Sequence, residues 1–265
     1  MCYICADMNM RLTFLGTGSS QGIPVVACDC ATCQSADPRD SRLRTSALVE
    51  VGDVRLVIDV GPDFRQQMLR ARVRSLDGIL LTHEHRDHVA GLDDVRAFNW
   101  VLQRPIDVWA SSRTAEAMRR DFSYAFAPAG IKYPGAPEVR LHEVHNYAPF
   151  DVAGVTVQPI PVMHGTMPIM GFRIGAMAYI TDISHIDPSE IERLRGIDVL
   201  VLSSVRFAPH PSHLGLQQAI DLFAQIAPRR GYITHIGHQL PPHAEVQAML
   251  PNGVELAYDG LCVEL

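Results

Sequence analysis

Three histidines and one aspartate lie within six residues, in the run His83-Glu84-His85-Arg86-Asp87-His88. Histidine is not a preferred core residue, and removing several imidazoles from water together is costly unless they are hydrogen-bonded or bound to metal. The run directly follows Ile79-Leu80-Leu81-Thr82, an apolar segment that predicts a short buried strand. The fold of this chain must therefore bring metal ions or buried hydrogen-bond partners to the end of that strand.

Imidazole nitrogens and aspartate oxygens are good ligands for Zn²⁺, and they also accept Mn²⁺ or Fe²⁺. His83 and His85 are two residues apart, so they can point to the same side and hold one ion. Asp87 and His88 can turn toward a second ion. Each ion needs about three protein ligands and a water. Two ions therefore need ligands from elsewhere in the chain.

Three further candidates stand directly after apolar segments that predict strands: His164, Asp182 and His235. Taken singly, a histidine after a strand is more often a surface or capping residue than a ligand. An aspartate there is more often a turn or helix-cap residue. Their shared setting, downstream of the histidine run, makes all three candidate metal ligands.

The histidine run resembles the H-x-H-x-D-H signature of the metallo-β-lactamase superfamily, whose later ligands follow as His, Asp and His at strand ends. The resemblance covers nearly the whole chain from Leu12 onward. It implies an α/β fold, an αββα four-layer sandwich in which two mixed sheets pack face to face with helices outside. It also implies one metal held by three histidines, a second held by an aspartate and two histidines, and one bridging aspartate: His83, His85 and His164; Asp87, His88 and His235; and Asp182.

A second motif, Cys28-Asp29-Cys30-Ala31-Thr32-Cys33, follows the glycine-rich segment 16–22. Clustered cysteines in a cytosolic chain indicate metal binding before disulfides. Both segments resemble those of the PhnP-like phosphodiesterases of the carbon–phosphorus lyase pathway. In that family three cysteines and a histidine, three residues beyond the last catalytic histidine, bind a structural zinc, which implies a site of Cys28, Cys30, Cys33 and His238. The alternatives are buried free thiols and a surface position for His238.

The glycine-rich segment is not a phosphate-binding P-loop, because no Gly-Lys-Ser/Thr follows it. Its glycines are expected to permit a tight strand exit near the metals. Upstream of His235, the segment Pro209-His210-Pro211-Ser212-His213 holds two more histidines. PhnP-like enzymes place a histidine here beside the metals, in contact with the scissile phosphate, which implies this role for His213. His210 is the competing candidate, and His213 could instead cap a helix that starts near Leu214.

These resemblances imply a hydrolase in which two metals activate a bridging water to attack a small phosphodiester, linear or cyclic. Asp87 and His213 are the predicted catalytic residues. The predicted cofactors are two catalytic divalent ions, Zn²⁺ or Mn²⁺ with Fe²⁺ as a further option, and one structural Zn²⁺. The alternatives are a thioesterase, lactonase or lactamase of the same fold, a biosynthesis protein resembling PqqB, an RNA-processing nuclease and a purely structural zinc module.

Composition bears on partners and location. The formal net charge is −6, and Lys132 is the only lysine, which argues against binding of long nucleic acid through its phosphates. No apolar stretch reaches the ~20 residues that span a membrane, and the start lacks the pattern of a signal peptide. A cytoplasmic protein with a small-molecule substrate and no membrane contact is expected, with a homodimer as the expected assembly.

No linker, repeat or low-complexity segment divides the 265 residues, which predicts a single domain over 1–265. Residues 1–9 are a candidate disordered extension. Apolar segments on both sides of Gly52-Asp53 predict a hairpin, and strand–helix alternation is expected in the second half. Residues 121–150 show little periodicity and are predicted to be an insertion or long loop near the substrate.

Overall fold

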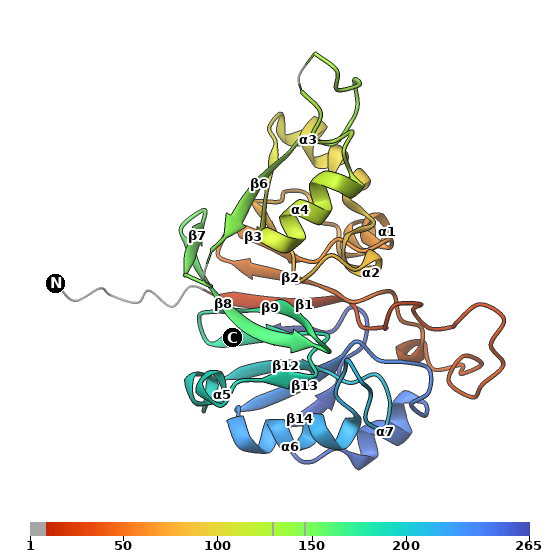
Figure 1. Cartoon of the computed structure of the whole chain (residues 1–265). Coiled ribbons are helices and arrows are strands. Elements are labelled where there is room, and N and C mark those ends of the chain that lie inside the picture. Colours follow the sequence, from red (N-terminus) through yellow and green to blue (C-terminus); the bar gives the residue numbers. More distant parts are fainter. Residues whose placement is uncertain (1–8, 129, 146) are drawn as a thin grey trace.

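The strands of this chain form two sheets that pack face to face, with helices on both outer faces (Figure 1). The computed structural model describes residues 9–128, 130–145 and 147–265. The first sheet has the order β15-β1-β2-β3-β4-β5-β6. Its strands are β1 (Met10–Gly16), β2 (Ser46–Val51), β3 (Val54–Ile58), β4 (Gly78–Leu80), β5 (Ile106–Ser111), β6 (Val139–Val144) and β15 (Cys262–Glu264).

The second sheet has the order β11-β8-β9-β10-β12-β13-β14, and β7 also pairs with β8. Its strands are β7 (Phe150–Val152), β8 (Val155–His164), β9 (Met167–Ile174), β10 (Met177–Ile180), β11 (His185–Ile186), β12 (Val199–Ser203), β13 (Arg230–Thr234) and β14 (Val254–Leu256). Both sheets are antiparallel at one side and parallel at the other, with the change at β3 and at β10. The prediction of two mixed sheets is confirmed.

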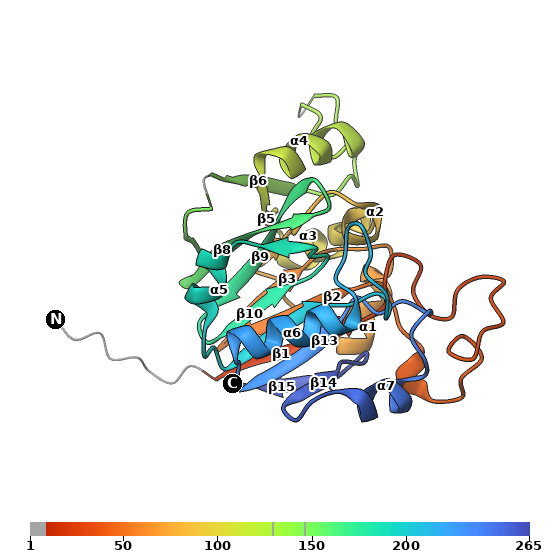
Figure 2. The same ribbon diagram turned by 60° about the horizontal axis from the view of Figure 1, so that its bottom comes forward.

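Helices cover the outer face of each sheet, as the two views in Figures 1 and 2 show. A buried cluster joins the first sheet to its helices, another joins the second sheet to its own, and a third lies between the sheets. The helices are α1 (Phe64–Ala71), α2 (Arg86–Val89), α3 (Arg96–Leu102) and α4 (Ser112–Asp121) on the first sheet, and α5 (Pro188–Leu194), α6 (Leu216–Ile226) and α7 (His243–Met249) on the second, with 3₁₀ turns η1 (Pro38–Asp40) and η2 (Leu92–Val95). The predicted four-layer sandwich is confirmed.

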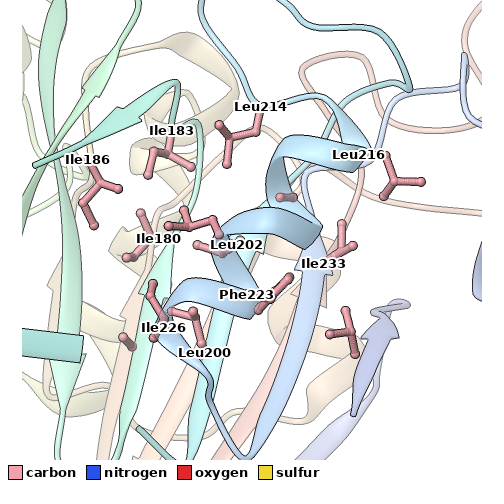
Figure 3. Close-up of a cluster of buried hydrophobic side chains, with 14 of the residues drawn as sticks. Ile180, Ile183, Ile186, Leu200, Leu202, Leu214, Leu216, Phe223, Ile226 and Ile233 are labelled. Carbon is pink, nitrogen blue, oxygen red and sulfur yellow. The ribbon is translucent and has the colours of Figure 1, made fainter. Parts of the chain in front are cut away.

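Helix α6 shows how the sequence specifies this packing. Its apolar residues recur at intervals of three and four, so they form one buried stripe against β12 and β13 (Figure 3): Leu216, Ala219, Leu222, Phe223 and Ile226. Gly231 of β13 makes room for this contact, because a Cβ there would lie 2.7 Å from the Phe223 ring. Burial of each Leu, Ile or Phe side chain stabilises the fold by roughly 1.5–3 kcal/mol.

Two local predictions have different outcomes. The hairpin at Gly52-Asp53 is confirmed, since β2 and β3 pair up to Val51 and Val54 and Gly52 has φ +57°. The long loop over 121–150 is wrong in part, because β6 pairs with β5 and β7 pairs with β8. Apolar and polar residues alternate over the first four residues of Val139–Val144, which is a short strand signal. Turns connect the described residues between α4 and β6.

Within the described residues, no helix is long and apolar enough to cross a membrane. The predicted extension at residues 1–9 lies outside the described residues except for Asn9, which is exposed. The single-domain assignment stays a prediction.

Candidate metal centre

The histidine run lies between β4 and α2. His83 and His85 are in extended backbone after β4, and their rings lie 4.5 Å apart between centroids. The chain then turns into α2, which carries Asp87 and His88. Backbone packing fixes this turn, because a Cβ on Gly91 would lie 2.1 Å from the carbonyl oxygen of Gly61. The first sheet therefore presents all four side chains from one short, tightly held segment.

The second sheet supplies the other three candidates. His164 ends β8, Asp182 follows β10 and His235 follows β13. The loops after these strands meet the loop after β4, so ligand atoms of residues far apart in sequence come within 4.8 Å of one another. Three such groups form: His83, His85 and His164; Asp87, His88 and His235; and His83, His88 and Asp182. The structure therefore brings together all seven residues predicted as catalytic metal ligands.

Asp182 lies between the two sides of this cluster. Its Oδ1 is 3.1 Å from Nε2 of His235, and its Oδ2 is 3.3 Å from Nε2 of His88. Asp87 Oδ2 lies 3.3 Å from Nε2 of His88 and 3.6 Å from Nε2 of His235. His88 and His235 belong to one donor set. Ligand atoms of His83 and of His164, from the other set, also lie within 4.8 Å of a carboxylate oxygen of Asp182, so Asp182 faces both sets, as a bridging ligand would.

Hydrogen bonds at Nδ1 of three of these histidines leave Nε2 free to face the cluster. Nδ1 of His88 donates to Asp59 Oδ2 at 2.7 Å. Nδ1 of His83 lies 2.9 Å from the Thr82 hydroxyl, which itself donates to Asp59 at 2.8 Å. Nδ1 of His164 lies 2.8 Å from the carbonyl oxygen of Asp182. Partners of this kind fix the tautomer and the ring orientation of metal-binding histidines.

Three residues of the site have left-handed backbone: Asp59 at φ +62°, Asp182 at +57° and His235 at +53°. This conformation is uncommon outside glycine, although Asp and His adopt it more readily than most residues. Such backbone costs of order 1–3 kcal/mol per residue and persists where the surrounding structure enforces it. The surrounding structure therefore holds these three residues in a backbone conformation that they would not favour on their own, and this conformation directs their side chains into the cluster.

The chemistry of the cluster fits divalent cations. Within the described residues, Nε2 of His83, of His88 and of His235 is buried without a hydrogen-bond partner, which is costly unless a further group binds there. Burial lowers the pKa of His83 well below its usual range, so this ring is in the neutral form that binds metal. Burial also disfavours charge on His88, but Asp182, Asp59 and Asp87 raise its pKa well above the usual range.

His213 lies beside this cluster, and His210 is further away. Nδ1 of His213 is 3.7 Å from Asp182 Oδ1, and its ring stacks on that of His235 with centroids 5.2 Å apart. His164, Asp182 and His213 also form a group of potential ligands. The ring of His210 contacts that of His213, at 5.0 Å between centroids, and its Nδ1 accepts from Ser212. The capping alternative for His213 is not what the structure shows, because Gly215 is the N-cap of α6.

The cysteine loop meets the loop after His235. Sγ of Cys28, of Cys30 and of Cys33 lies 3.1, 3.6 and 3.7 Å, respectively, from Nδ1 of His238. A hydrogen bond from the backbone N–H of Cys33 is the main cause that lowers the pKa of the Cys30 thiol, to about 6. Three sulfurs around one imidazole nitrogen could hold a metal ion, and this donor set is the one that closed structural zinc sites use.

The glycine-rich segment connects these two sites. The backbone N–H of Ile236 donates to the carbonyl oxygen of Thr17, and that of Ser19 donates to the carbonyl oxygen of Ile236. The segment therefore runs alongside His235, as its predicted place near the metals requires. The prediction from sequence did not include Asp59 or Thr82. Asp59 directly follows the apolar strand β3, which is the same signal that identified Asp182.

Comparison with known proteins shows what this chain resembles. Residues 54–236 match the family model of the Beta-lactamase superfamily domain. A solved structure, a new diphosphatase from the PhnP family, is 39% identical, with 97% of this chain and 98% of that chain covered and a TM-score of 0.91. An octanoyltransferase of Porphyromonas gingivalis is 43% identical over 95% of this chain, which spans about half (51%) of that relative's length. A ribonuclease Z of Mycobacterium marinum is 30% identical, with 74% of this chain and 71% of the relative covered.

Proposed function

This chain belongs to the β-lactamase superfamily and is a hydrolase of the metallo-β-lactamase fold, and from that premise we propose that it hydrolyses a small phosphodiester, linear or cyclic, with two divalent metal ions. The observation that carries the proposal is the pair of donor sets on the two sides of Asp182. A pair of ions held by such sets acts on both the attacking and the leaving oxygen of a phosphoryl group. Similarity to a PhnP-family diphosphatase supports phosphorus chemistry.

Each residue of the centre has a role in this reaction. When bound, the two ions supply an activated water and positive charge for the phosphoryl oxygens. Zn²⁺ and Mn²⁺ both suit nitrogen and carboxylate donors, and Fe²⁺ is a further option. His83, His85 and His164 would hold one ion, Asp87, His88 and His235 would hold the other, and Asp182 would contact both.

His213 is placed to contact the substrate. Burial lowers the pKa of His213 to about 3, so its imidazole is neutral and carries one N–H. This N–H can donate to a phosphoryl or leaving oxygen bound beside Asp182, while the other ring nitrogen remains an acceptor. We assign the catalytic role to His213 and not to His210, since only His213 reaches the groups around Asp182.

Diphosphate hydrolysis is a second candidate, because the similar PhnP-family structure is that of a diphosphatase. Both reactions are attacks of water on a phosphorus atom, and the same two-metal centre serves both. The difference lies in the leaving group, a phosphate in one case and an alcohol in the other. Long nucleic acid is not the proposed substrate, although a ribonuclease Z is among the relatives, because the net charge is −6 and the sequence has no basic block.

The test compares three substrate classes with the purified protein in Mn²⁺ or Zn²⁺: bis-p-nitrophenyl phosphate, a nucleoside diphosphate and an octanoyl thioester. Turnover of the first supports the main proposal, and turnover of the second alone supports diphosphate hydrolysis. The thioester is included because one relative is an octanoyltransferase. Metal-dependent turnover of the thioester alone would refute phosphorus chemistry. Asp182→Ala should abolish the activity, since it removes the contact common to both donor sets.

A further inference from the structure

A cavity separate from the metal centre lies on the outer face of the first sheet, where β1, β2 and β15 meet the C-terminal end of α1. Its volume is about 480 Å³, which is in the range of small-molecule sites. One carboxylate, that of Glu50, and five arginines line it: Arg11, Arg55, Arg70, Arg72 and Arg74. The chain as a whole is acidic, with a net charge of −6, so this concentration of positive charge is local.

Three of these arginines are held in place by the protein. Nε of Arg11 donates to Glu50 Oε2 at 2.7 Å. Nε of Arg55 lies 3.3 Å from Glu50 Oε1, and Nη1 of Arg55 donates to the Ser75 hydroxyl at 2.8 Å. Arg70 donates to the carbonyl oxygen of Leu15 and also forms an ion pair with Asp259 at 3.2 Å. Glu50 pairs with both Arg11 and Arg55, and Glu264, the cross-strand neighbour of Arg11, also acts on Arg11, so the unbalanced positive charge of the cavity lies mainly at Arg72 and Arg74.

The other two arginines are exposed at the rim. Within the described residues, neither Arg72 nor Arg74 has a carboxylate within ion-pair distance. Cations near the C-terminal end of a helix are favoured by the helix dipole, which accounts in part for the arginines after α1. It does not account for Arg11 and Arg55, which belong to β1 and β3. The strands and the helix end thus contribute cations to the same concave space.

The rest of the lining offers little apolar surface, because Leu15 and Leu48 are almost fully buried and only Val73 is half-buried. Guanidinium groups bind phosphate through paired hydrogen bonds and also stack on aromatic rings. A ligand that uses both of these properties of arginine carries a phosphate and a flat aromatic ring system. We propose that this cavity binds a purine mononucleotide, with its phosphate at Arg72 and Arg74 and its flat base stacked on the guanidinium groups of Arg11 and Arg55.

Cys262 provides a reporter at this position, because it lines the cavity and its side chain is exposed. The experiment uses the full-length, metal-loaded protein and adenosine 5′-monophosphate (AMP). The rate at which iodoacetamide alkylates Cys262 is measured by mass spectrometry of the C-terminal peptide, with increasing AMP. Bound AMP should slow this alkylation to a plateau, and the concentration at half effect gives the affinity.

Matched variants separate this cavity from other sites. Arg72→Ala with Arg74→Ala should weaken the AMP effect roughly tenfold or more, since it removes charge-assisted hydrogen bonds. Arg193→Ala with Arg195→Ala, on α5, changes the net charge equally and should leave the effect unchanged. Asp182→Asn should also leave it unchanged, because it alters only the metal centre.

Three results would overturn the proposal. The first is no protection of Cys262 at millimolar AMP. The second is equal protection in the Arg72/Arg74 double variant, provided that its circular dichroism shows a folded protein. The third is loss of protection in the Asp182→Asn variant, which would place the nucleotide at the metal centre. The first and third results do not depend on the folding of the double variant.

Discussion

Asp59 holds two residues of the metal centre through one buried carboxylate, directly at His88 and through Thr82 at His83. Asp59→Asn keeps the size of the side chain and removes the charge that orients these rings. Loss of such a partner reduces metal affinity about 10- to 100-fold. We expect a decrease of that size in a competition titration of the metal-free protein with Zn²⁺. Asp53→Asn, in the hairpin loop, is the control, and equal affinity in both variants would contradict this role for Asp59.

His213 and His210 form a natural pair of variants, since both lie on one loop and only His213 reaches Asp182. Removal of a catalytic hydrogen-bond donor or acid–base group lowers kcat by about 10²- to 10⁴-fold. We expect this loss for His213→Ala, with unchanged metal content by elemental analysis. His210→Ala should stay within a few-fold of the parent. The reverse order of the two rates would transfer the role to His210.

At the level of single residues, sequence patterns identified the candidate metal ligands better than the residues that hydrogen-bond to those ligands. His164, Asp182 and His235 could be proposed because their types and strand-end positions match metal chemistry. Asp59 has the same position, but its partner is a histidine ring, and hydrogen bonds between distant segments leave no spacing in the sequence. The left-handed backbone of Asp182 and His235 could not be predicted from the sequence either, because it results from the packing of the strands on both sides.

The cysteine loop is the element with the clearest metal prediction. Cys30→Ser removes one of three sulfurs around His238, so we expect about one zinc fewer per chain and a lower folded yield. Elemental analysis of the purified protein measures the first effect. Cys262→Ser is the matched control, since Cys262 is far from this cluster and should not alter the zinc content. Equal zinc in both variants would contradict a Cys₃His site.

Helix α7 begins at a buried histidine whose protonation opposes folding. Burial, together with the nearby Arg42 and Arg39, lowers the pKa of His243 to about 4, while Asp37 and Asp40 act against this shift. The unfolded chain binds this proton below about pH 6.5. Between about pH 6.5 and 4 the unfolded state therefore holds more protons, and this contribution to the free energy of unfolding decreases as the pH falls.

His243→Gln should therefore flatten the loss of stability from pH 6.5 to 4, as measured by urea unfolding at several pH values. A glutamine oxygen can still accept the hydrogen bond from Arg42, which lies 3.0 Å from Nδ1 of His243. His185→Gln, at an exposed position, is the control and should keep the slope of the parent. An unchanged slope in His243→Gln would mean that His243 does not contribute.

Most elements could be predicted, and the exceptions have a common cause. Helix α6 and strands β12 and β13 have strong periodicity or continuous apolar runs, so their sequence alone defines them. Strand β6 is largely half-buried at the edge of its sheet. Its apolar and polar residues alternate over only four positions, which is too short a pattern to stand out. Strands β11 and β15 have two and three residues, too few for any period to show.

For the whole molecule, metal removal should lower stability. The metal centre joins the two sheets, and without ions it leaves buried nitrogen atoms unpaired within the described part of the chain. Chelation with EDTA should therefore reduce Tm, and added Zn²⁺ should raise it again in a concentration-dependent way, as expected for a ligand of the native state. Differential scanning calorimetry measures both. A Tm that is insensitive to chelator, with metal loss verified, would contradict this coupling.

The architecture as a whole was predictable through the resemblance of its motifs, and its topology was not. Nothing in the residues themselves states that β15, near the C-terminal end of the chain, pairs with β1 and adds an edge strand to the first sheet. Such pairing depends on contacts between the two ends of the chain. The cavity with five arginines has the same origin, since its lining comes from both ends and from the residues after α1.

The division of the metal donors between two sheets has a consequence for synthesis of the protein. The ribosome releases the run from His83 to His88 long before it has made His235, and His238 follows later still. A nascent chain therefore carries only part of each donor set, and an ion that binds early has no complete shell to hold it. Tight metal uptake can begin only when β13 has been made and has joined its sheet. The loaded protein is thus a chain whose translation has already passed His238.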